Sequence, residues 1–340
     1  MGRCDPLDLE PIVEKRLWQR FGKRELHLSQ EADFKTTPAQ VYVLCGWHTC
    51  SDIPLTSVPA SARGGECDIH IQIASGFSPI AKNAGRVVFD HSTEKSLIRI
   101  EDVADFEIRG GRQIRIWPAA RATQKDIEIF LFGPAWATLC HQRGMLPIHA
   151  SAIVTGKGIT AIAGHSGAGK STTAGWLHSL GYELIADDIL PVSFNQYSIP
   201  GAWPYLRRLK LHRDPIIQLA FTPVGIVSET LDPEKYFVRP RHIGDDKWRR
   251  LERLYLLENE ATDSNAPIEQ ITGADAVRVL VDQTYHFNFV LGTRRFGDHL
   301  ALCARLASKT LIYRVRRSSS SEAGKELGGL ICAHLEGAEA

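Results

Sequence analysis

One eight-residue segment constrains this chain more than any other. Residues 164–171 read GHSGAGKS and fit the pattern G-x-x-x-x-G-K-[ST] without a mismatch. An apolar stretch, ITAIAG, leads into the segment, and an amphipathic stretch with Ala174, Leu177 and Leu180 on one stripe follows it, up to Gly181. This order predicts a buried strand, a glycine loop and a helix that ends at Gly181, as in an α/β phosphate-binding core.

The residue types in this segment suit a nucleoside triphosphate. Backbone N–H groups of such a loop turn toward phosphate oxygens, and the helix N-terminus adds partial positive charge. Lys170 is expected to reach the β- and γ-phosphates, and the Ser171 hydroxyl to ligate Mg²⁺. ATP and Mg²⁺ are therefore the expected cofactors. The predicted nucleotide-binding residues are Gly164, His165, Ser166, Gly167, Ala168, Gly169, Lys170, Ser171 and Thr172.

Two aspartates follow the loop closely. Asp187 comes 17 residues after Lys170, which leaves room for one helix and one short strand, YELIA. Asp187 and Asp188 should thus lie at the carboxyl end of that strand, the edge of an α/β sheet where ligands bind. One carboxylate can bind the Mg²⁺ hydration shell while the other removes a proton from an attacking hydroxyl. The alternative is that the pair only caps the following loop.

Composition and charge narrow the class of protein. At 340 residues the chain is long enough for two domains. Its net charge of +1 is too small for the broad electrostatic attraction to phosphates that is expected of a protein that binds nucleic acids or membrane surfaces. No apolar run approaches the length of a membrane span. The seven cysteines are odd in number and never form a CxxC pair, so we expect reduced thiols and neither a zinc site nor a disulfide framework. With no signal sequence at the start, a cytoplasmic location is expected.

The hydrophobic pattern changes along the chain and predicts three parts. Residues 1–122 are expected to form a β-rich domain, because Ile69, Ile71 and Ile73 alternate with polar residues and a hairpin is predicted around Gly110-Gly111. Residues 123–317 open with a helical pattern interrupted at Gly133-Pro134 and then carry the glycine loop. Residues 318–340 are expected to be a polar linker and a terminal tail.

The segments IHASAIV, GHSGAGKST and ADD together resemble the HPr kinase/phosphorylase superfamily, in its HPr-kinase-related branch. The resemblance implies a kinase core similar in fold to the nucleotide core of phosphoenolpyruvate carboxykinase. It also implies an active site made of a strand histidine, the loop lysine and serine, and the aspartate pair. In this chain these are His149, Lys170, Ser171, Asp187 and Asp188, with Asp188 as the general base and Ser171 and Asp187 on the metal side, although the motif alone does not order the two aspartates.

The departures from the family pattern bear on the substrate. HPr kinases carry Glu directly after the loop serine, whereas this chain has Thr172-Thr173, and no LExRGxGI-type signature is found. Both differences argue against HPr as the acceptor. Members of the related branch phosphorylate a serine of natural-product precursor peptides, lasso-peptide precursors included, and the resemblance implies such a peptide or small protein as the partner. Cations for the transition state are sought among Arg207, Arg208, Lys210, Lys235 and Arg239.

Two alternatives remain open at this stage. The chain could phosphorylate a sugar or another small metabolite, or it could be a nucleotide-dependent regulatory module without catalysis. Neither a nucleic-acid partner nor a membrane partner is expected, and homo-oligomer formation is left open.

Overall fold

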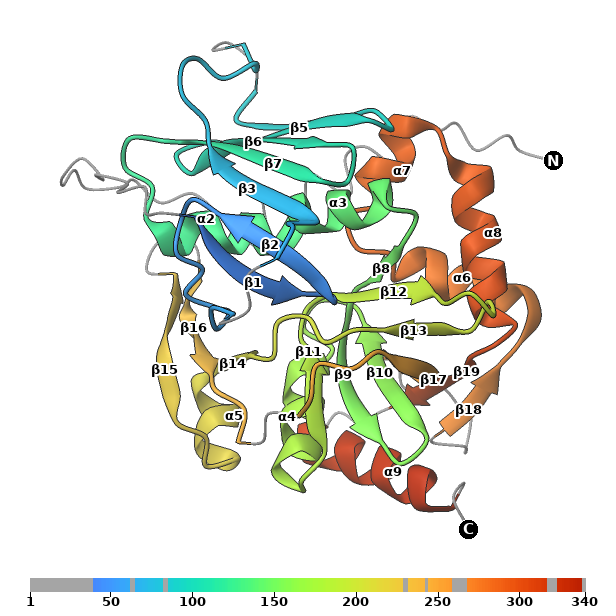
Figure 1. Cartoon of the computed structure of the whole chain (residues 1–340). Helices are drawn as coiled ribbons and strands as arrows, with labels where there is room; N and C mark the ends of the chain where they lie inside the picture. The colour runs from blue at the N-terminus through green and yellow to red at the C-terminus, as the bar shows by residue number, and fades with distance from the viewer. Residues whose placement is uncertain are drawn as a thin grey trace.

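The computed structural model describes residues 39–61, 65–81, 85–228, 232–241, 244–258, 268–316 and 323–337. Over these residues the fold is mixed α/β, with three sheets and helices between and around them (Figure 1). The first sheet has seven strands in the order β1-β2-β3-β7-β6-β5-β4. Its strands are β1 (Gln40–Leu44), β2 (Trp47–Ser51), β3 (Ile69–Ile73), β4 (Val87–His91), β5 (Lys95–Ile100), β6 (Ala104–Arg109) and β7 (Gln113–Pro118).

The local predictions for this first sheet are confirmed. Ile69 and Ile71 of β3 are buried on the core side, as their alternation with polar residues predicts. Strands β6 and β7 pair antiparallel as a hairpin. Gly110 and Gly111 take φ values of +56° and +62° at its turn, a conformation that glycine adopts without steric cost.

A broken helix connects the first sheet to the rest of the chain. It consists of α2 (Gln124–Phe130), the π-helical turn η2 (Leu131–Ala135) and α3 (Trp136–Gln142). The break falls at Gly133-Pro134, as predicted, since proline cannot donate the backbone hydrogen bond of a helix interior. In Figure 1 this helix runs between the first and second sheets. Phe106, Trp136 and Leu254 belong to one hydrophobic core that continues from the first sheet to the second.

The second sheet has nine strands and carries the glycine loop. Its main path is β11-β9-β10-β17-β13-β12-β8, with β19 beside β17 and β18 beside β19. Strand β9 is antiparallel to both β10 and β11, so β10 and β11 end at the edge where β9 begins. The strands are β8 (Leu146–Ile148), β9 (Ala150–Thr155), β10 (Gly158–Gly164), β11 (Glu183–Ala186), β12 (Leu190–Phe194), β13 (Pro200–Ala202), β17 (Arg249–Glu258), β18 (Ile268–Ile271) and β19 (Leu311–Arg316).

Helices cover this second sheet. Helix α4 (Lys170–Ser179) follows the glycine loop and packs against α9 (Ala323–Gly337), which lies in the predicted tail. Leu177 and Leu327 share a second core there. Gly181 has a φ of +107°, which confirms the predicted helix end. The prediction that Leu180 lies on the apolar stripe was wrong, because Leu180 is the C-cap residue and is 54% exposed. The remaining helices of this part are α6 (Gly273–Asp282), α7 (Asn288–Thr293) and α8 (Phe296–Ala307).

A small third sheet flanks the edge where β10 and β11 end. Its order is β14-β16-β15, and α5 (Arg213–Gln218) follows directly on β14. Strand β14 also packs against α4, which brings the third sheet close to the glycine loop. Its strands are β14 (Leu209–His212), β15 (Pro223–Ser228) and β16 (Asp232–Val238).

The prediction that all cysteines are reduced thiols was wrong for one pair. Cys50 and Cys67 form a disulfide, with their Cα atoms 5.8 Å apart. Strand β2 pairs with β3 in parallel, and Cys67 lies just before β3, so sheet pairing brings together two cysteines that the sequence spacing does not connect. Cys45, Cys140 and Cys303 are free and buried. Among the described residues no helix is long and apolar enough to span a bilayer.

Candidate active site

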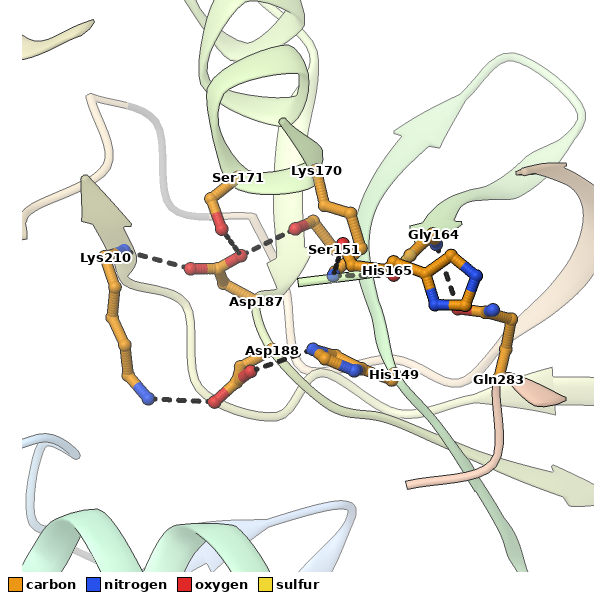
Figure 2. A network of polar contacts seen from close by, with 10 residues as sticks. All are labelled: His149, Ser151, Gly164, His165, Lys170, Ser171, Asp187, Asp188, Lys210 and Gln283. Atoms are coloured by element: carbon orange, nitrogen blue, oxygen red, sulfur yellow. Dashed lines mark hydrogen bonds and ion pairs between the residues drawn. The ribbon is translucent and has the colours of Figure 1, made fainter. Parts of the chain in front are cut away.

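The residues predicted to act together meet at one edge of the second sheet. The glycine loop follows the end of β10, Asp187 and Asp188 follow the end of β11, and His149 precedes β9 (Figure 2). Because β9 runs opposite to its two neighbours, its first residues face the last residues of β10 and β11. The antiparallel placement of β9 thus brings His149 to the aspartates.

The glycine loop needs backbone conformations that favour glycine. Gly164, Gly167 and Gly169 have φ values of +146°, +84° and +95°. A Cβ atom at Gly164 would lie 2.8 Å from the carbonyl oxygen of Leu257, so a side chain is excluded there by space as well as by φ. His165, Ser166 and Gly167 are exposed, while Ala168 is buried and anchors the loop. The rim of the loop is therefore open to solvent.

Lys170, the first residue of α4, turns its ammonium group back into the loop. Its Nζ atom donates to the carbonyl oxygens of Gly164 at 2.8 Å and His165 at 3.1 Å. The residue is only 8% exposed, and a buried ammonium group requires such partners. An anion held in the loop would meet this charge. Ser171 and Thr172, in the first turn of α4, are both half-buried.

Asp187 is buried and held from three sides. Its Oδ1 atom accepts hydrogen bonds from the hydroxyls of Ser151 at 2.6 Å and Ser171 at 2.8 Å, and its Oδ2 atom accepts from the backbone N–H of Lys210 at 2.9 Å (Figure 2). The residue is 4% exposed. The structure thus brings together Ser171 and Asp187, the two residues predicted on the metal side.

Asp188 has a different environment from its neighbour. Its φ of +74° is uncommon for a residue with a side chain, although Asp tolerates it better than most. Its Oδ1 atom lies 3.4 Å from Nε2 of His149, and its Oδ2 atom accepts from Nζ of Lys210 at 3.0 Å. The two consecutive carboxylates therefore lie in different environments. Hydroxyl groups and backbone surround Asp187, whereas Asp188 lies between an imidazole and an ammonium group (Figure 2).

His149 does not lie inside a strand, although the resemblance implied a strand histidine. It occupies a bend between β8 and β9, because β8 pairs with β12 whereas β9 pairs with β10 and β11. The backbone N–H of His149 donates to the carbonyl oxygen of Gln283 at 2.7 Å, and its ring meets the ring of Tyr285 edge-on at 5.5 Å. Its side chain remains 24% exposed and faces Asp188.

The five candidate cations separate by location. Lys210, on β14, forms the ion pair with Asp188. Arg207 is directed away from the aspartates, toward Asp246 at 3.0 Å. The remaining three are Arg208, which lies 4.0 Å over the ring of Phe237 and whose pKa is lowered by burial, Lys235, which is half-buried on β16, and Arg239, which is exposed.

Two polar residues of this edge were not anticipated from the sequence. Ser151 donates to Asp187, and Gln283 accepts the N–H of Gly164 with its side chain at 3.0 Å. Ser151 follows His149 by two residues, and in the strand that was expected through both, the period-two alternation of side chains would have placed them on the same face. Gln283 lies 119 residues from Gly164, and no local pattern identifies it.

The oxygen donors at this edge suit a small hard cation. The Ser171 hydroxyl and the Asp187 carboxylate are in contact, and Mg²⁺ is usually held by one or two such groups together with phosphate oxygens and water. Within the described ranges no group of three or more His, Cys, Asp or Glu side chains is arranged to hold a metal.

Comparisons with known proteins give a distant likeness to solved structures. No family model matches the sequence. No curated protein matches it. Among solved structures, the HPr(Ser) kinase/phosphatase from Coxiella burnetii matches with 12% sequence identity and a TM-score of 0.31, covering 57% of this chain and 99% of that one. At these values the function has to be argued from the site of this chain itself.

Proposed function

We propose that this chain is an ATP-dependent, Mg²⁺-requiring kinase that transfers the γ-phosphoryl group of ATP to a serine hydroxyl of a peptide or small protein. The observation that carries the proposal is the meeting of two parts at one sheet edge. A glycine loop with its buried Lys170 lies beside Asp187 and Asp188, which have separate sets of partners. Phosphoryl transfer needs positively charged groups that bind the phosphates and a base beside them, and little other chemistry from the protein.

The glycine loop and Lys170 would bind the phosphates of ATP. Donors at the helix N-terminus would face the phosphate oxygens, and the ammonium group of Lys170 would exchange its two carbonyl partners for them. Ser171 and Asp187 would hold Mg²⁺, which shields the phosphate charge when it is bound. The hydrogen bonds that Asp187 receives from Ser151 and from the N–H of Lys210 would keep its carboxylate in place.

Asp188 is the better candidate for the general base. Asp187 already accepts three hydrogen bonds, whereas the contacts of Asp188 described above are with the side chains of Lys210 and His149. Its side chain is 16% exposed, so an acceptor hydroxyl could approach it. His149 would orient the Asp188 carboxylate while it takes the proton from the hydroxyl. This environment supports the order of the two aspartates that the motif leaves open.

Lys210 is the cation that the geometry favours for the transferred group. Its ammonium group contacts the base, so it would lie near the phosphoryl group when an acceptor hydroxyl sits between them. There it could neutralise charge that develops on the phosphoryl oxygens. It would then act from the side opposite to Lys170, since the two lysines approach the aspartates from β14 and from α4.

The acceptor that we propose is a precursor peptide of a natural-product pathway, of the lasso-peptide type. This part of the proposal rests on the resemblance of the sequence motifs and on the departures from the HPr kinase pattern at Thr172-Thr173. The open rim of the loop and the accessible Asp188 are compatible with a peptide chain end as acceptor.

The test is a labelling experiment. The full-length protein is incubated with γ-labelled ATP, Mg²⁺ and a synthetic serine-containing precursor peptide of the lasso-peptide type, and the label is located by mass spectrometry. Phosphate on a peptide serine supports the proposal. Label on a metabolite from an added pool would instead identify a small-molecule kinase. Nucleotide binding with no transfer to any acceptor would indicate a regulatory module and contradict the proposed catalysis.

A further inference from the structure

One buried glutamine connects two parts of the site that come from distant stretches of the chain. Gln283 is the C-cap residue of α6 and only 4% exposed. Its side-chain Oε1 atom accepts the backbone N–H of Gly164 at 3.0 Å, and its backbone carbonyl accepts the N–H of His149 at 2.7 Å. The same residue thus contacts the start of the glycine loop, as Figure 2 shows, and the backbone of the histidine beside Asp188.

The backbone after α6 explains how Gln283 reaches this place. Ile148 and Thr284 form an isolated antiparallel bridge, and the N–H of Tyr285 donates to the carbonyl oxygen of Pro147 at 2.8 Å. The segment 283–285 is therefore joined to residues 147–149 by one isolated bridge and its flanking backbone hydrogen bonds. This pairing fixes the backbone of Gln283 independently of what its side chain does.

The hydrogen bond to Gly164 replaces one that the sheet cannot supply. Gly164 is the last residue of β10, and its φ of +146° turns the chain out of the strand into the loop. Its N–H is buried, and a buried donor without an acceptor is costly. The Gln283 side chain satisfies this donor at the residue where the loop begins, so it holds the first peptide group of the loop in one orientation.

We propose that Gln283 is a positioning residue for nucleotide binding, an inference that rests on the proposed function of the glycine loop. Its side chain fixes the loop that would cradle the phosphates, and its backbone carbonyl fixes His149. Loss of the side-chain acceptor should therefore weaken nucleotide binding, while the backbone contact with His149 remains.

The test variant is Gln283→Met, which keeps a side chain of similar length but removes the amide. A matched control exists elsewhere in the chain, since the Gln142 side chain accepts the N–H of Gly111 at 2.9 Å in the hairpin region of the first sheet. Gln142→Met removes the same kind of bond away from the site. The Kd for MgADP is measured by calorimetry, and hydrogen exchange is followed on peptides that cover residues 164–170.

We expect Gln283→Met to raise the Kd for MgADP about tenfold, the size of effect given by one lost hydrogen bond to a buried group, and to speed exchange in residues 164–170. Gln142→Met should leave both quantities within about twofold of the parent protein, because its bond lies far from the loop. If Gln283→Met does not fold, Gln283→Asn, whose shorter amide cannot reach Gly164, replaces it with the same expectation.

Two results would overturn the inference. If a Gln283 variant unfolds more easily but binds MgADP as tightly as the parent protein, Gln283 has only a structural role. A parent protein that does not bind MgADP at all would overturn the proposed function itself, and this inference with it. The two failures are distinguished by the parent measurement.

Discussion

Two carboxylates, the buried Asp105 on the first sheet and the half-buried Asp188 just after a strand of the second, are paired with cations in different ways. Each carboxylate oxygen of Asp105, on β6, accepts a hydrogen bond from the guanidinium group of Arg99, at 2.8 Å for Oδ1 and 2.7 Å for Oδ2. The Oδ2 atom also accepts one from the hydroxyl of Ser78. That guanidinium group also donates to the carbonyl oxygens of Ala81 and Ile80. Asp188, at the end of β11, is held instead by the ammonium group of Lys210 and the imidazole of His149.

The difference separates a structural carboxylate from one that is available for chemistry. A bidentate guanidinium pair has fixed geometry, and at Asp105 it occupies both oxygens and completes the packing of the first sheet. A lysine ammonium group is a mobile point charge on a flexible stem, so the partners of Asp188 can rearrange around a substrate. The type of the partners, a fixed guanidinium pair at Asp105 and a flexible ammonium group at Asp188, is therefore consistent with the proposed role of Asp188 as a base.

The largest effect on folding at neutral pH is expected from Asp105→Asn. The substitution removes the carboxylate that pairs with the half-buried guanidinium group of Arg99, and we expect a loss of about 1.5–3 kcal/mol in the free energy of unfolding. Phosphoryl transfer by the folded fraction should not change. Urea denaturation measures the first quantity, and Asp90→Asn on the exposed side of β4 is the control. A loss of transfer without a loss of stability would reverse the assignment of roles.

A pH effect is expected where the first sheet meets α7. Burial lowers the pKa of His91 and of His141 to about 4 and that of His286 well below 6.5, and Nε2 of His91 lies 3.1 Å from Nε2 of His286. The unfolded chain, with histidine pKa values near 6.5, binds these protons first as the pH falls. Stability from these groups is therefore complete above about pH 6.5 and declines between about pH 6.5 and pH 4.

For His91 alone the decline by pH 4 is about 3 kcal/mol, from about 1.4 kcal/mol per unit of pKa shift. The measurement is the difference in unfolding free energy between the parent protein and His91→Gln at a series of pH values. The variant should lose less stability on acidification, and the exposed His70→Gln should behave as the parent does. Identical pH profiles for parent and His91→Gln would contradict the role given to His91.

The smallest effect is expected from Lys210→Met. Lys170 and the metal would still neutralise most of the phosphoryl charge, so kcat should fall only about tenfold, or about 1.4 kcal/mol in activation free energy. The KM for ATP should stay within a few-fold of the parent value. Arg239 is exposed and directly follows β16, so Arg239→Met is the control and should leave kcat unchanged. If both variants have parent-like kcat values, Lys210 has no part in the transfer.

The sequence predicted the features that depend on residues close together in the chain. The order of strand, glycine loop, helix and strand follows from apolar spacing and from the short interval between Lys170 and Asp187, and the structure has these elements at β10, α4 and β11. The positive φ values at Gly110, Gly111 and Gly181 were equally predictable, because few other residues tolerate them.

What the sequence did not predict depends on contacts between distant segments. The strand through His149 was expected to be continuous, but β8 and β9 choose different neighbours and the chain bends between them. Gln283 reaches Gly164 across 119 residues, and Cys50 meets Cys67 only through strand pairing. The ranges predicted for the domains and the catalytic roles of the site residues remain predictions.

The most direct test of the central claim is to separate binding from transfer in Asp188→Asn. The variant keeps the size of the side chain but removes the base, so MgATP should bind within about threefold of the parent affinity while single-turnover transfer to the peptide serine falls by about 10²–10⁴. Its urea midpoint should stay close to that of the parent, in contrast to Asp105→Asn. Transfer within tenfold of the parent rate, with ATP bound, would contradict the assignment of Asp188 as the base.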